Sequence, residues 1–145
     1  MPIHQDKIIA PYAASKIFDL VLDVQEYPKF LPWCKSARII ERGDGYVIAD
    51  LTIGYKMMTA TYRSKVKFTP SRIDIEYVEG PFKKLHNHWQ FKPLSDDSCE
   101  VEFFIDFEFK SSVFQHMIEL LFSEAVKVMV GAFEKRAKVV YGAIN

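Results

Sequence analysis

Apolar and polar side chains alternate with a period of two over most of the chain from Ser36 to Phe109. The clearest case is CEVEFFIDFEF, from Cys99 to Phe109, where apolar side chains hold one phase and acidic side chains most of the other. This alternation predicts β-strands that have one covered face and one solvated face. The same pattern recurs over residues 47–55, 58–68, 73–77 and 85–92.

Short breaks rich in Gly, Pro and Asp separate these strands. They are GDG (Gly43–Gly45), TPS (Thr69–Ser71) and PLSDD (Pro93–Asp97), and their lengths are typical of hairpin connections. With a weak first strand around Ile3–Ile9, we expect an antiparallel sheet of about six or seven strands. At about 3.3 Å per residue the Cys99–Phe109 segment spans roughly 36 Å, so strand twist should curl the sheet and give it a concave side.

Two other segments have helical periodicity. A short amphipathic helix follows PYAAS, and its pattern continues up to Tyr27. A second helix is predicted to begin at Ser112, which forms a capping box with Gln115, and to end before Gly142. At about 1.5 Å per residue its roughly 30 residues give a length of about 45 Å, enough to lie across the sheet and cover the concave side. Its apolar arc comprises Phe114, Ile118, Leu121, Phe122, Ala125, Val126, Val128, Met129, Ala132, Phe133, Val139 and Val140.

Composition adds limits on the class of protein. The chain has 145 residues with no repeat or linker, so we expect one domain over residues 1–145. Basic and acidic residues balance at 19 each, which gives no global field to gather nucleic acid, and we expect no DNA partner. Cys34 and Cys99 form no CxxC pair, which suits a reducing compartment. The N-terminus matches no targeting segment, and Glu119, Glu124 and Lys127 interrupt the C-terminal apolar region, so we expect a cytoplasmic protein.

Enzyme signatures are missing from the sequence. It contains no GxSxG, HExxH, phosphate loop or GxGxxG motif. His86 and His88 share the solvated phase of a strand, so we expect no metal site, and the inward phase offers no convincing titratable residue. We therefore expect no catalytic residues, no cofactor and no enzyme activity. Arg136 falls within the apolar arc of the long helix, so it either snorkels to solvent or meets a polar head group at a cavity mouth.

The segment EYPKFLPWC, from Glu26 to Cys34, concentrates bulky rings between two prolines. Tyr27, Phe30 and Trp33 are three residues apart, and both a 3₁₀ turn and a polyproline helix would align them on one side. One interpretation is a plug that closes one end of the sheet as ordinary core. The other is a rigid aromatic lip at an apolar cavity. Physical reasoning alone favours the plug.

Three motifs carry a family resemblance. EYPKFLPWC, GPFKKLHNHWQF (Gly80–Phe91) and VEFFIDFEFKS (Val101–Ser111) resemble the coenzyme Q-binding START-like family, part of the helix-grip superfamily of lipid carriers and polyketide cyclases. The resemblance implies an α+β helix-grip fold, in which a curved antiparallel sheet holds a long C-terminal helix. It also implies a hydrophobic tunnel that binds ubiquinone or a related isoprenoid lipid and supports respiratory quinone function. Mitochondrial members carry a transit segment, so this chain is more similar to bacterial cytosolic members.

The resemblance shifts the interpretation of EYPKFLPWC towards the lip. It implies an entrance formed by Tyr27, Pro28, Phe30, Leu31, Pro32 and Trp33, with Phe82, Leu85 and Trp89 beside it. The implied tunnel lining is Phe103, Ile105, Phe107, Phe114, Ile118, Leu121, Ala125 and Met129, with Arg136 near the head group.

The leading hypothesis is therefore non-catalytic lipid binding. It includes transient contact with the inner membrane through the aromatic ridge and Lys29, Lys35, Lys83 and Lys84. Since family members include a toxin that blocks association of ribosomal subunits, binding to a ribosomal subunit is the alternative. A cyclase or hydrolase of the wider superfamily ranks third.

Overall fold

The structure, a computed structural model, describes residues 3–55 and 58–142, apart from the side chains of residues 55, 58, 117, 118 and 120–125. Its centre is one antiparallel sheet of seven strands in the order β1-β7-β6-β5-β4-β3-β2. The strands are β1 (Ile3–Ala10), β2 (Cys34–Gly43), β3 (Tyr46–Tyr55), β4 (Met58–Thr69), β5 (Arg72–Glu79), β6 (Phe82–Ser95) and β7 (Ser98–Phe109). The predicted α+β class and strand number are confirmed.

The predicted hairpin connections are also confirmed. Each of the three predicted turns contains two residues between the strands, namely Asp44–Gly45, Pro70–Ser71 and Asp96–Asp97. Gly45 has a φ of 76°, a left-handed conformation that glycine adopts without the steric cost of a Cβ atom.

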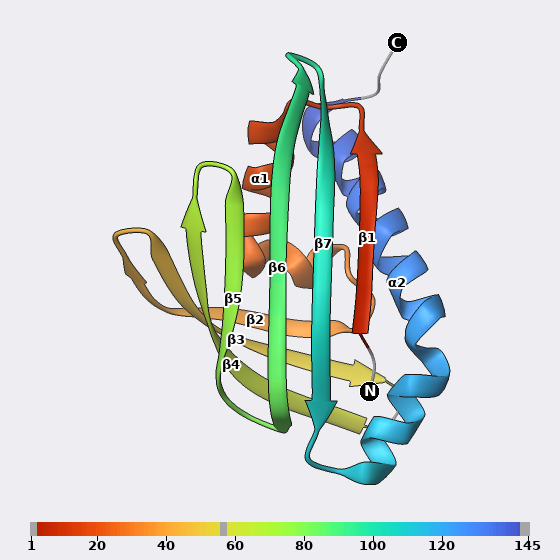
Figure 1. Ribbon diagram of the computed structural model, residues 1–145. Coiled ribbons are helices and arrows are strands. Elements are labelled where there is room, and N and C mark those ends of the chain that lie inside the picture. The colour runs from red at the N-terminus through yellow and green to blue at the C-terminus, as the bar shows by residue number, and fades with distance from the viewer. Residues whose placement is uncertain (1–2, 56–57, 143–145) are drawn as a thin grey trace.

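The sheet bends strongly along its width. In Figure 1, β1, β7, β6 and β5 stand upright, whereas β2, β3 and β4 cross beneath them and curl around the side that faces away from the viewer. Register shifts between Ile39 and Glu41 in β2 and between Arg63 and Ser64 in β4 accompany the bend, since an extra residue on one strand increases local twist. The helices lie on the resulting concave side (Figure 1).

The helical segment after β1 is divided into two elements, in contrast to the single helix predicted up to Tyr27. Helix α1 (Ala14–Leu22) ends where Asp23 leaves helical geometry, and a 3₁₀ helix, η1 (Val24–Lys29), follows. Pro28 lies inside η1 and has no N–H to donate, so a longer α-helix is disfavoured there. The three-residue repeat of Tyr27 and Phe30 is thus a 3₁₀ repeat, one of the two conformations expected.

The long helix α2 spans Ser112–Tyr141, and its start agrees with the prediction, but its capping residue does not. Ser111, not Ser112, is the N-cap, and its Oγ accepts a hydrogen bond from the Phe114 N–H at 3.2 Å. Gln115 Oε1 instead accepts from the Phe109 N–H at 2.7 Å, which ties the helix start to β7. The predicted end before Gly142 is confirmed.

The predicted apolar arc of α2 is only partly covered. Val128, Val139 and Val140 lie in that arc, yet they are 45%, 74% and 48% exposed. The arc spans nearly half of the helix circumference, and the concave sheet covers less than that. The end of α2 is held by two hydrogen bonds, from Tyr12 Oη to the Gly142 carbonyl at 3.0 Å and from Tyr141 Oη to the Lys16 carbonyl at 2.7 Å.

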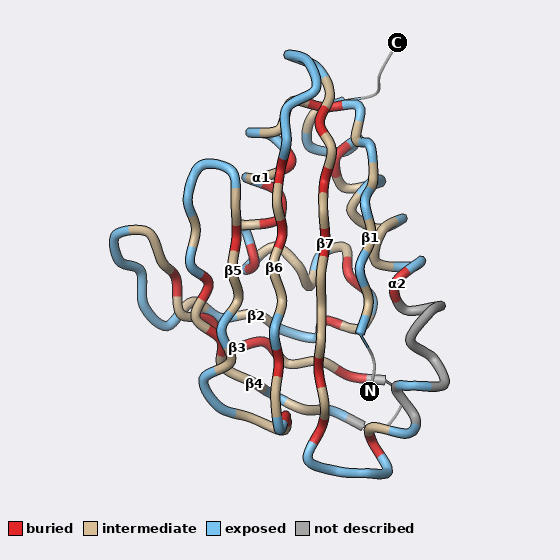
Figure 2. The backbone as a smooth tube through the Cα atoms, in the orientation of Figure 1, coloured by how far each residue is buried: buried red, intermediate tan, exposed pale blue. Residues whose placement is uncertain are grey.

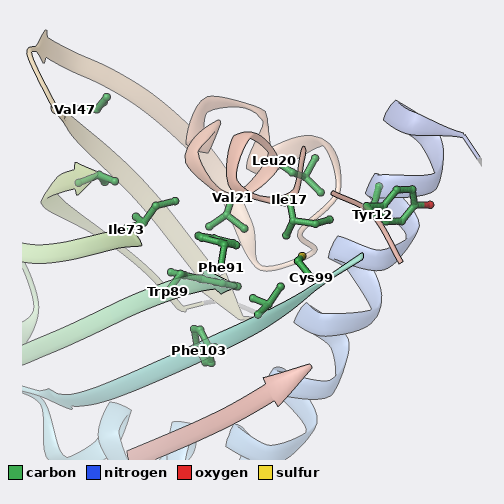
Figure 3. Close-up of a cluster of buried hydrophobic side chains, with 13 residues drawn as sticks. Tyr12, Ile17, Leu20, Val21, Val47, Ile73, Trp89, Phe91, Cys99 and Phe103 are labelled. Atoms are coloured by element: carbon green, nitrogen blue, oxygen red, sulfur yellow. The ribbon is translucent and has the colours of Figure 1, made fainter. Parts of the chain in front are cut away.

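Buried residues divide into three clusters, and Figure 2 marks the buried positions along the backbone in red. The first joins α1 to β6 and β7, where Val21, Phe91 and Phe103 point towards one another (Figure 3). The second, here called the η1 cluster, comprises Val24, Leu31, Cys34, Ala49 and Leu51. The third, here called the Phe82 cluster, comprises Phe82, Leu85, Phe107, Phe109 and Phe114.

Candidate functional site

A cavity of about 210 Å³ lies between β1, α1, the middle of β6 and β7, and the C-terminal half of α2. Most of its wall is apolar. The lining residues are Asp6, Ile8, Ile9, Ala10, Pro11, Tyr12, Ile17, Leu20, Val21, Trp89, Val101, Phe103, Val126, Met129, Val130, Phe133, Glu134, Ala137 and Lys138.

Two small side chains are among the lining residues, Ala10 from β1 and Ala137 from α2, and each ends at Cβ. Trp89 and Phe103 form part of the wall on the sheet, with ring centroids 4.7 Å apart (Figure 3). Phe133 lines the cavity from α2, with its ring 5.6 Å from that of Trp89.

Charged groups interrupt the apolar wall on both β1 and α2. Asp6 lines the cavity from β1, and Glu134 and Lys138 line it from α2. Asp6 pairs with Phe103 and His4 with Ile105, so both polar side chains share the concave face with those residues. The expectation that the inward phase holds no titratable residue is therefore wrong. The inward phase was clear in the long strands, whereas His4 and Asp6 belong to the short edge strand β1.

His4 and Asp6 lie close together at this end of the cavity. His4 Nε2 is 3.8 Å from Asp6 Oδ2, and the imidazole centroid is 6.1 Å from that of Phe103. Side-chain exposure is 28% for His4 and 46% for Asp6, so the pair lies between the apolar wall and solvent.

The segment EYPKFLPWC packs beside the cavity and fills its own space. Leu31 is buried in the η1 cluster, while Tyr27, Phe30 and Trp33 are partly buried against it. The rings of Tyr27 and Phe30 meet that of Phe133 edge-on, at centroid distances of 5.6 and 5.2 Å. The Tyr27 hydroxyl donates to the Val21 carbonyl, and burial raises the pKa of Tyr27. Among the described residues, none from this segment lines the cavity, and the packing is that of a plug.

Two prolines of the segment differ in their surroundings. Pro28 is partly buried within η1, and Pro32 is exposed. Neither lines the cavity.

The other residues expected at the site fall into three groups. Trp89, Phe103 and Met129 line the cavity. Phe82, Leu85, Phe107 and Phe114 are buried in the Phe82 cluster, and Ile105 is partly buried between that cluster and the first. The side chains of Ile118, Leu121 and Ala125 lie outside the described residues.

Arg136 joins α2 to η1. Its Nη2 lies 3.4 Å from Glu26 Oε1, and its guanidinium carbon lies 5.5 Å from the ring centroid of Phe30. Glu26 also pairs with Lys29 at 2.7 Å, and this hydrogen bond lowers the pKa of the Glu26 carboxyl. Arg136 does not line the cavity; it fastens the plug to the long helix.

Sequence reasoning missed most of the cavity wall. A signal was available on α2, where Val126, Val130, Phe133 and Ala137 recur at intervals of three and four residues. The signal on β1 was weaker, because His4 and Asp6 interrupt the apolar phase that Ile8 continues. The site prediction was centred on the aromatic segment EYPKFLPWC, and it therefore did not include these residues.

Two absences within the described residues limit what the site can be. No group of three or more His, Cys, Asp or Glu side chains converges within residues 3–55 and 58–142 in a way that could hold a metal ion. Within that same part of the chain, no helix has the length and apolarity needed to cross a bilayer.

Curated relatives match the chain over almost its full length. The toxin PasT from Escherichia coli O6:H1, named for persistence and stress resistance, is 39% identical over 99% of this chain and 91% of its own. Ribosome association toxin RatA from Escherichia coli K12 is 38% identical over the same shares. Coenzyme Q-binding protein COQ10 homolog B from Xenopus laevis is 33% identical over 96% of this chain and 59% of its own.

Solved structures share the fold. The 18 kDa protein CC1736 from Caulobacter crescentus aligns with a TM-score of 0.79 and 34% identity over 99% of this chain and 100% of its own. The Zhui aromatase/cyclase from Streptomyces sp. R1128 aligns with a TM-score of 0.83 over 99% of each chain, at 16% identity, which shows the fold alone. The family of polyketide cyclase / dehydrase and lipid transport proteins matches residues 10–134. The chain belongs to this family, together with the RatA and COQ10 relatives.

Proposed function

We propose that the protein binds ubiquinone or a related isoprenoid lipid in the cavity between α2 and the sheet, without catalysing a reaction on it. The observation that carries this proposal is the apolar cavity itself, whose aliphatic and aromatic wall ends in the charged groups Asp6, Glu134 and Lys138. Concave sites with apolar walls and a few polar groups are typical of small-molecule binding. The printed name of the COQ10 relative supports coenzyme Q as the ligand class.

The driving force would be transfer of apolar lipid surface from water. Each Å² of apolar surface removed from water contributes about 25 cal/mol before the cost of ordering the ligand. The volume of about 210 Å³ lies below the range of about 300–1,000 Å³ typical of drug-sized ligands. It accommodates one end of such a lipid, and a longer tail requires α2 to move away from the sheet.

The first experiment is lipid extraction from protein purified out of a ubiquinone-producing host, followed by mass spectrometry. A stoichiometric isoprenoid lipid is the expected result. Isothermal titration with ubiquinone-2, the analogue with two isoprene units, then locates the site. Val130→Phe places a ring in the cavity wall and should weaken binding, whereas Val139→Phe on the exposed side of the same helix is the matched control.

Two results would contradict the proposal. One is purified protein that carries no lipid and shows no heat of binding with ubiquinone-2. The other is equal affinity in Val130→Phe and Val139→Phe, because a ligand held in the cavity must compete with the new ring.

Ribosome association is the second candidate function. It is favoured by the 38% identity with RatA, which extends over 91% of that protein. A sucrose gradient of cell extract would show co-migration with a ribosomal subunit. The substitution Lys83→Glu/Lys84→Glu should abolish it if these lysines bind the subunit, and Lys92→Glu, an exposed change on the same strand, is the control.

A cytoplasmic location with transient contact to the inner membrane follows from the lipid proposal. Three of the lysines proposed for that contact are paired with acids. Lys29 lies 2.7 Å from Glu26, Lys83 lies 3.3 Å from Glu108, and Lys84 lies 3.2 Å from Asp106. Since these pairs offset much of the positive charge, we expect weak and salt-sensitive attraction to anionic vesicles.

A further inference from the structure

Three charged side chains, here called the cavity rim, lie where the apolar wall meets solvent. Asp6 comes from β1, and Glu134 and Lys138 come from α2. The Asp6 side chain is 46% exposed, and Glu134 and Lys138 are exposed as well. An amphiphile that buries its apolar tail against the wall leaves its polar head group where the wall ends. The rim is therefore the part of the cavity that meets the head group.

The charges of the rim do not cancel. Two of them are acids, and Lys138 is the single base among the described residues that line the cavity. Glu134 and Lys138 are four residues apart on α2, a spacing at which opposite charges are neighbours on a helix and offset each other. Lys138 also lies in the last turn of α2, where the partial negative charge of the helix end offsets a positive side chain.

Asp6 adds a negative charge from the opposite element. The charged partner of its carboxylate is His4, at 3.8 Å, and an imidazole carries charge only when it is protonated. At pH 8, above the ordinary pKa of histidine, the rim therefore carries two negative charges against one positive charge.

Isoprenoid lipids fall into two classes by the charge of the head group. Quinones, quinols and prenyl alcohols are uncharged, whereas prenyl carboxylates and prenyl diphosphates are anionic at neutral pH. The apolar wall contacts the tail, which is the same in both classes, so the wall cannot separate them. The rim can, because a unit charge several ångströms away at a protein surface changes affinity by about threefold.

We infer that the cavity rim selects isoprenoid lipids with an uncharged head group and rejects those that carry a carboxylate or a diphosphate. This inference rests on the proposed function, because it names the class of ligand taken by the same cavity. A prenyl group is activated for transfer as its diphosphate. A protein with this preference therefore takes up its lipid only after the transferring reaction has released diphosphate.

Isothermal titration at pH 8 with geraniol and geranic acid tests the inference. Both have ten carbon atoms and the same two isoprene units, and they differ in whether the head group is a hydroxyl or a carboxylate. The measured quantity is the selectivity ratio, which is the Kd of geranic acid divided by the Kd of geraniol. Asp6→Asn and Glu134→Gln should each lower this ratio about threefold, and Lys138→Met should raise it about threefold. Asp96→Asn, in the exposed turn between β6 and β7, makes the same change in net charge and should leave the ratio unaltered.

Salt gives a second test, whose sign depends on the rim. Raising the NaCl concentration from about 0.05 M to about 0.5 M should lower the selectivity ratio of the wild-type protein, since screening weakens the repulsion of geranic acid. In the double variant Asp6→Asn/Glu134→Gln, Lys138 is the rim charge that remains, and it attracts geranic acid. The same increase in salt should therefore raise the ratio of this variant. Geranyl diphosphate, which carries more negative charge, should show larger effects of the same sign.

Thermal unfolding checks that each variant folds, and the salt dependence of the wild-type protein tests the inference without any variant. A wild-type ratio at or below one, or one that rises with salt, would overturn the inference and leave lipid binding intact. So would a ratio that falls in neither Asp6→Asn nor Glu134→Gln, that falls in Lys138→Met, or that falls equally in Asp96→Asn. A fall in only one of the two rim acids supports the inference and assigns the selection to that carboxylate. Wild-type protein that binds neither geraniol nor ubiquinone-2 would overturn the proposed function and this inference together.

Discussion

The two sides of Phe133 differ in how their space is used. On one side its ring meets Tyr27 and Phe30 edge-on, and the η1 cluster behind them is filled. On the other side the same residue borders the cavity, which Ala10 and Ala137 also line. Rings lie on both sides, since Trp89 and Phe103 also line the cavity. The number of rings therefore does not distinguish the hollow region of this fold from the filled one, and the most aromatic segment packs in the filled one.

The largest expected effect comes from a filled region far from the cavity. Phe82→Ala should lower the free energy of unfolding by about 3–5 kcal/mol, because it removes a buried ring and leaves a cavity. The lost ring lies 4.4 Å from that of Phe109 and 5.3 Å from that of Tyr62. Urea unfolding measures the loss.

The affinity of Phe82→Ala for ubiquinone-2 should stay at the wild-type value under conditions in which the variant remains folded. Phe104→Ala, on the opposite face of the sheet, controls for loss of a phenyl ring. Weaker ubiquinone-2 binding by folded Phe82→Ala would place the ligand near the Phe82 cluster and not in the cavity.

Replacing an alanine by leucine should cost different amounts of stability on the two sides of Phe133. Ala49 is buried in the η1 cluster, and Ala49→Leu should cost about 1–3 kcal/mol through overpacking. Ala137 is equally buried but borders the cavity, so Ala137→Leu should cost less than Ala49→Leu, since the residues around the added carbons can move into the hollow beside them.

Chemical denaturation of both alanine variants gives the comparison. Ala137→Leu should also weaken ubiquinone-2 binding, whereas Ala49→Leu should not. A larger stability loss in Ala137→Leu than in Ala49→Leu would mean that the cavity closes in solution.

Alkaline pH should lower the free energy of unfolding through titratable groups in the η1 cluster. Burial raises the pKa of the Cys34 thiol from 9.0 to about 11. Because the folded state holds this proton more tightly, its contribution is complete below pH 9 and is lost as the pH rises to 11, at no more than about 1.4 kcal/mol per pH unit. Burial raises the pKa values of Tyr27 and Tyr62 as well, which adds loss of the same sign at higher pH.

Unfolding free energies measured from pH 8 to pH 11 test this dependence. The variant Cys34→Ala should show a shallower decline than the wild-type protein over that range. Parallel curves for the two proteins would show that Cys34 does not contribute to the pH dependence.

The smallest expected effect concerns Arg136, which joins α2 to the segment EYPKFLPWC. Arg136→Met keeps the length of the side chain and removes the charge near Phe30 and Glu26. We expect a loss of about 0.5–1 kcal/mol from the cation–π contact with Phe30, and a smaller loss at high salt because the ion pair with Glu26 is screened. Lys135→Met, at the exposed neighbouring position, is the control, and equal losses in the two variants would remove the assigned role.

The sheet could be predicted from the sequence because its alternation is long and its turns are chemically distinct. Segments such as Cys99–Phe109 hold one phase over a whole strand, and Asp44–Gly45 marks a hairpin by itself. The predicted start of α2 at Ser112 is confirmed, but its capping residue is Ser111 and not Ser112, since both serines fit a cap and only the backbone geometry decides between them. Helix α1 ends at Leu22 because Asp23 leaves helical geometry, and an aspartate at that position does not by itself predict the end of a helix.

The candidate site was harder to predict than the fold. Periodicity shows that a side chain faces inward, but it does not show whether the space opposite is filled. Trp89, Phe103 and Met129 were expected at the site and do line the cavity. Ala10 and Ala137 looked like ordinary core residues, because their place beside the cavity depends on how elements more than a hundred residues apart in the chain come together.

The pairing of β1 with β7 has a consequence for how the protein is made. Strand β1 leaves the ribosome before the other six strands of the sheet, yet its partner β7 is the last of the seven to be synthesised, and Gln5 and Glu102 are 97 residues apart. Contacts this distant in sequence form late and slow folding. Strand β1 must therefore remain unpaired until all the other strands of the sheet have been synthesised, and the cavity that it borders forms only then.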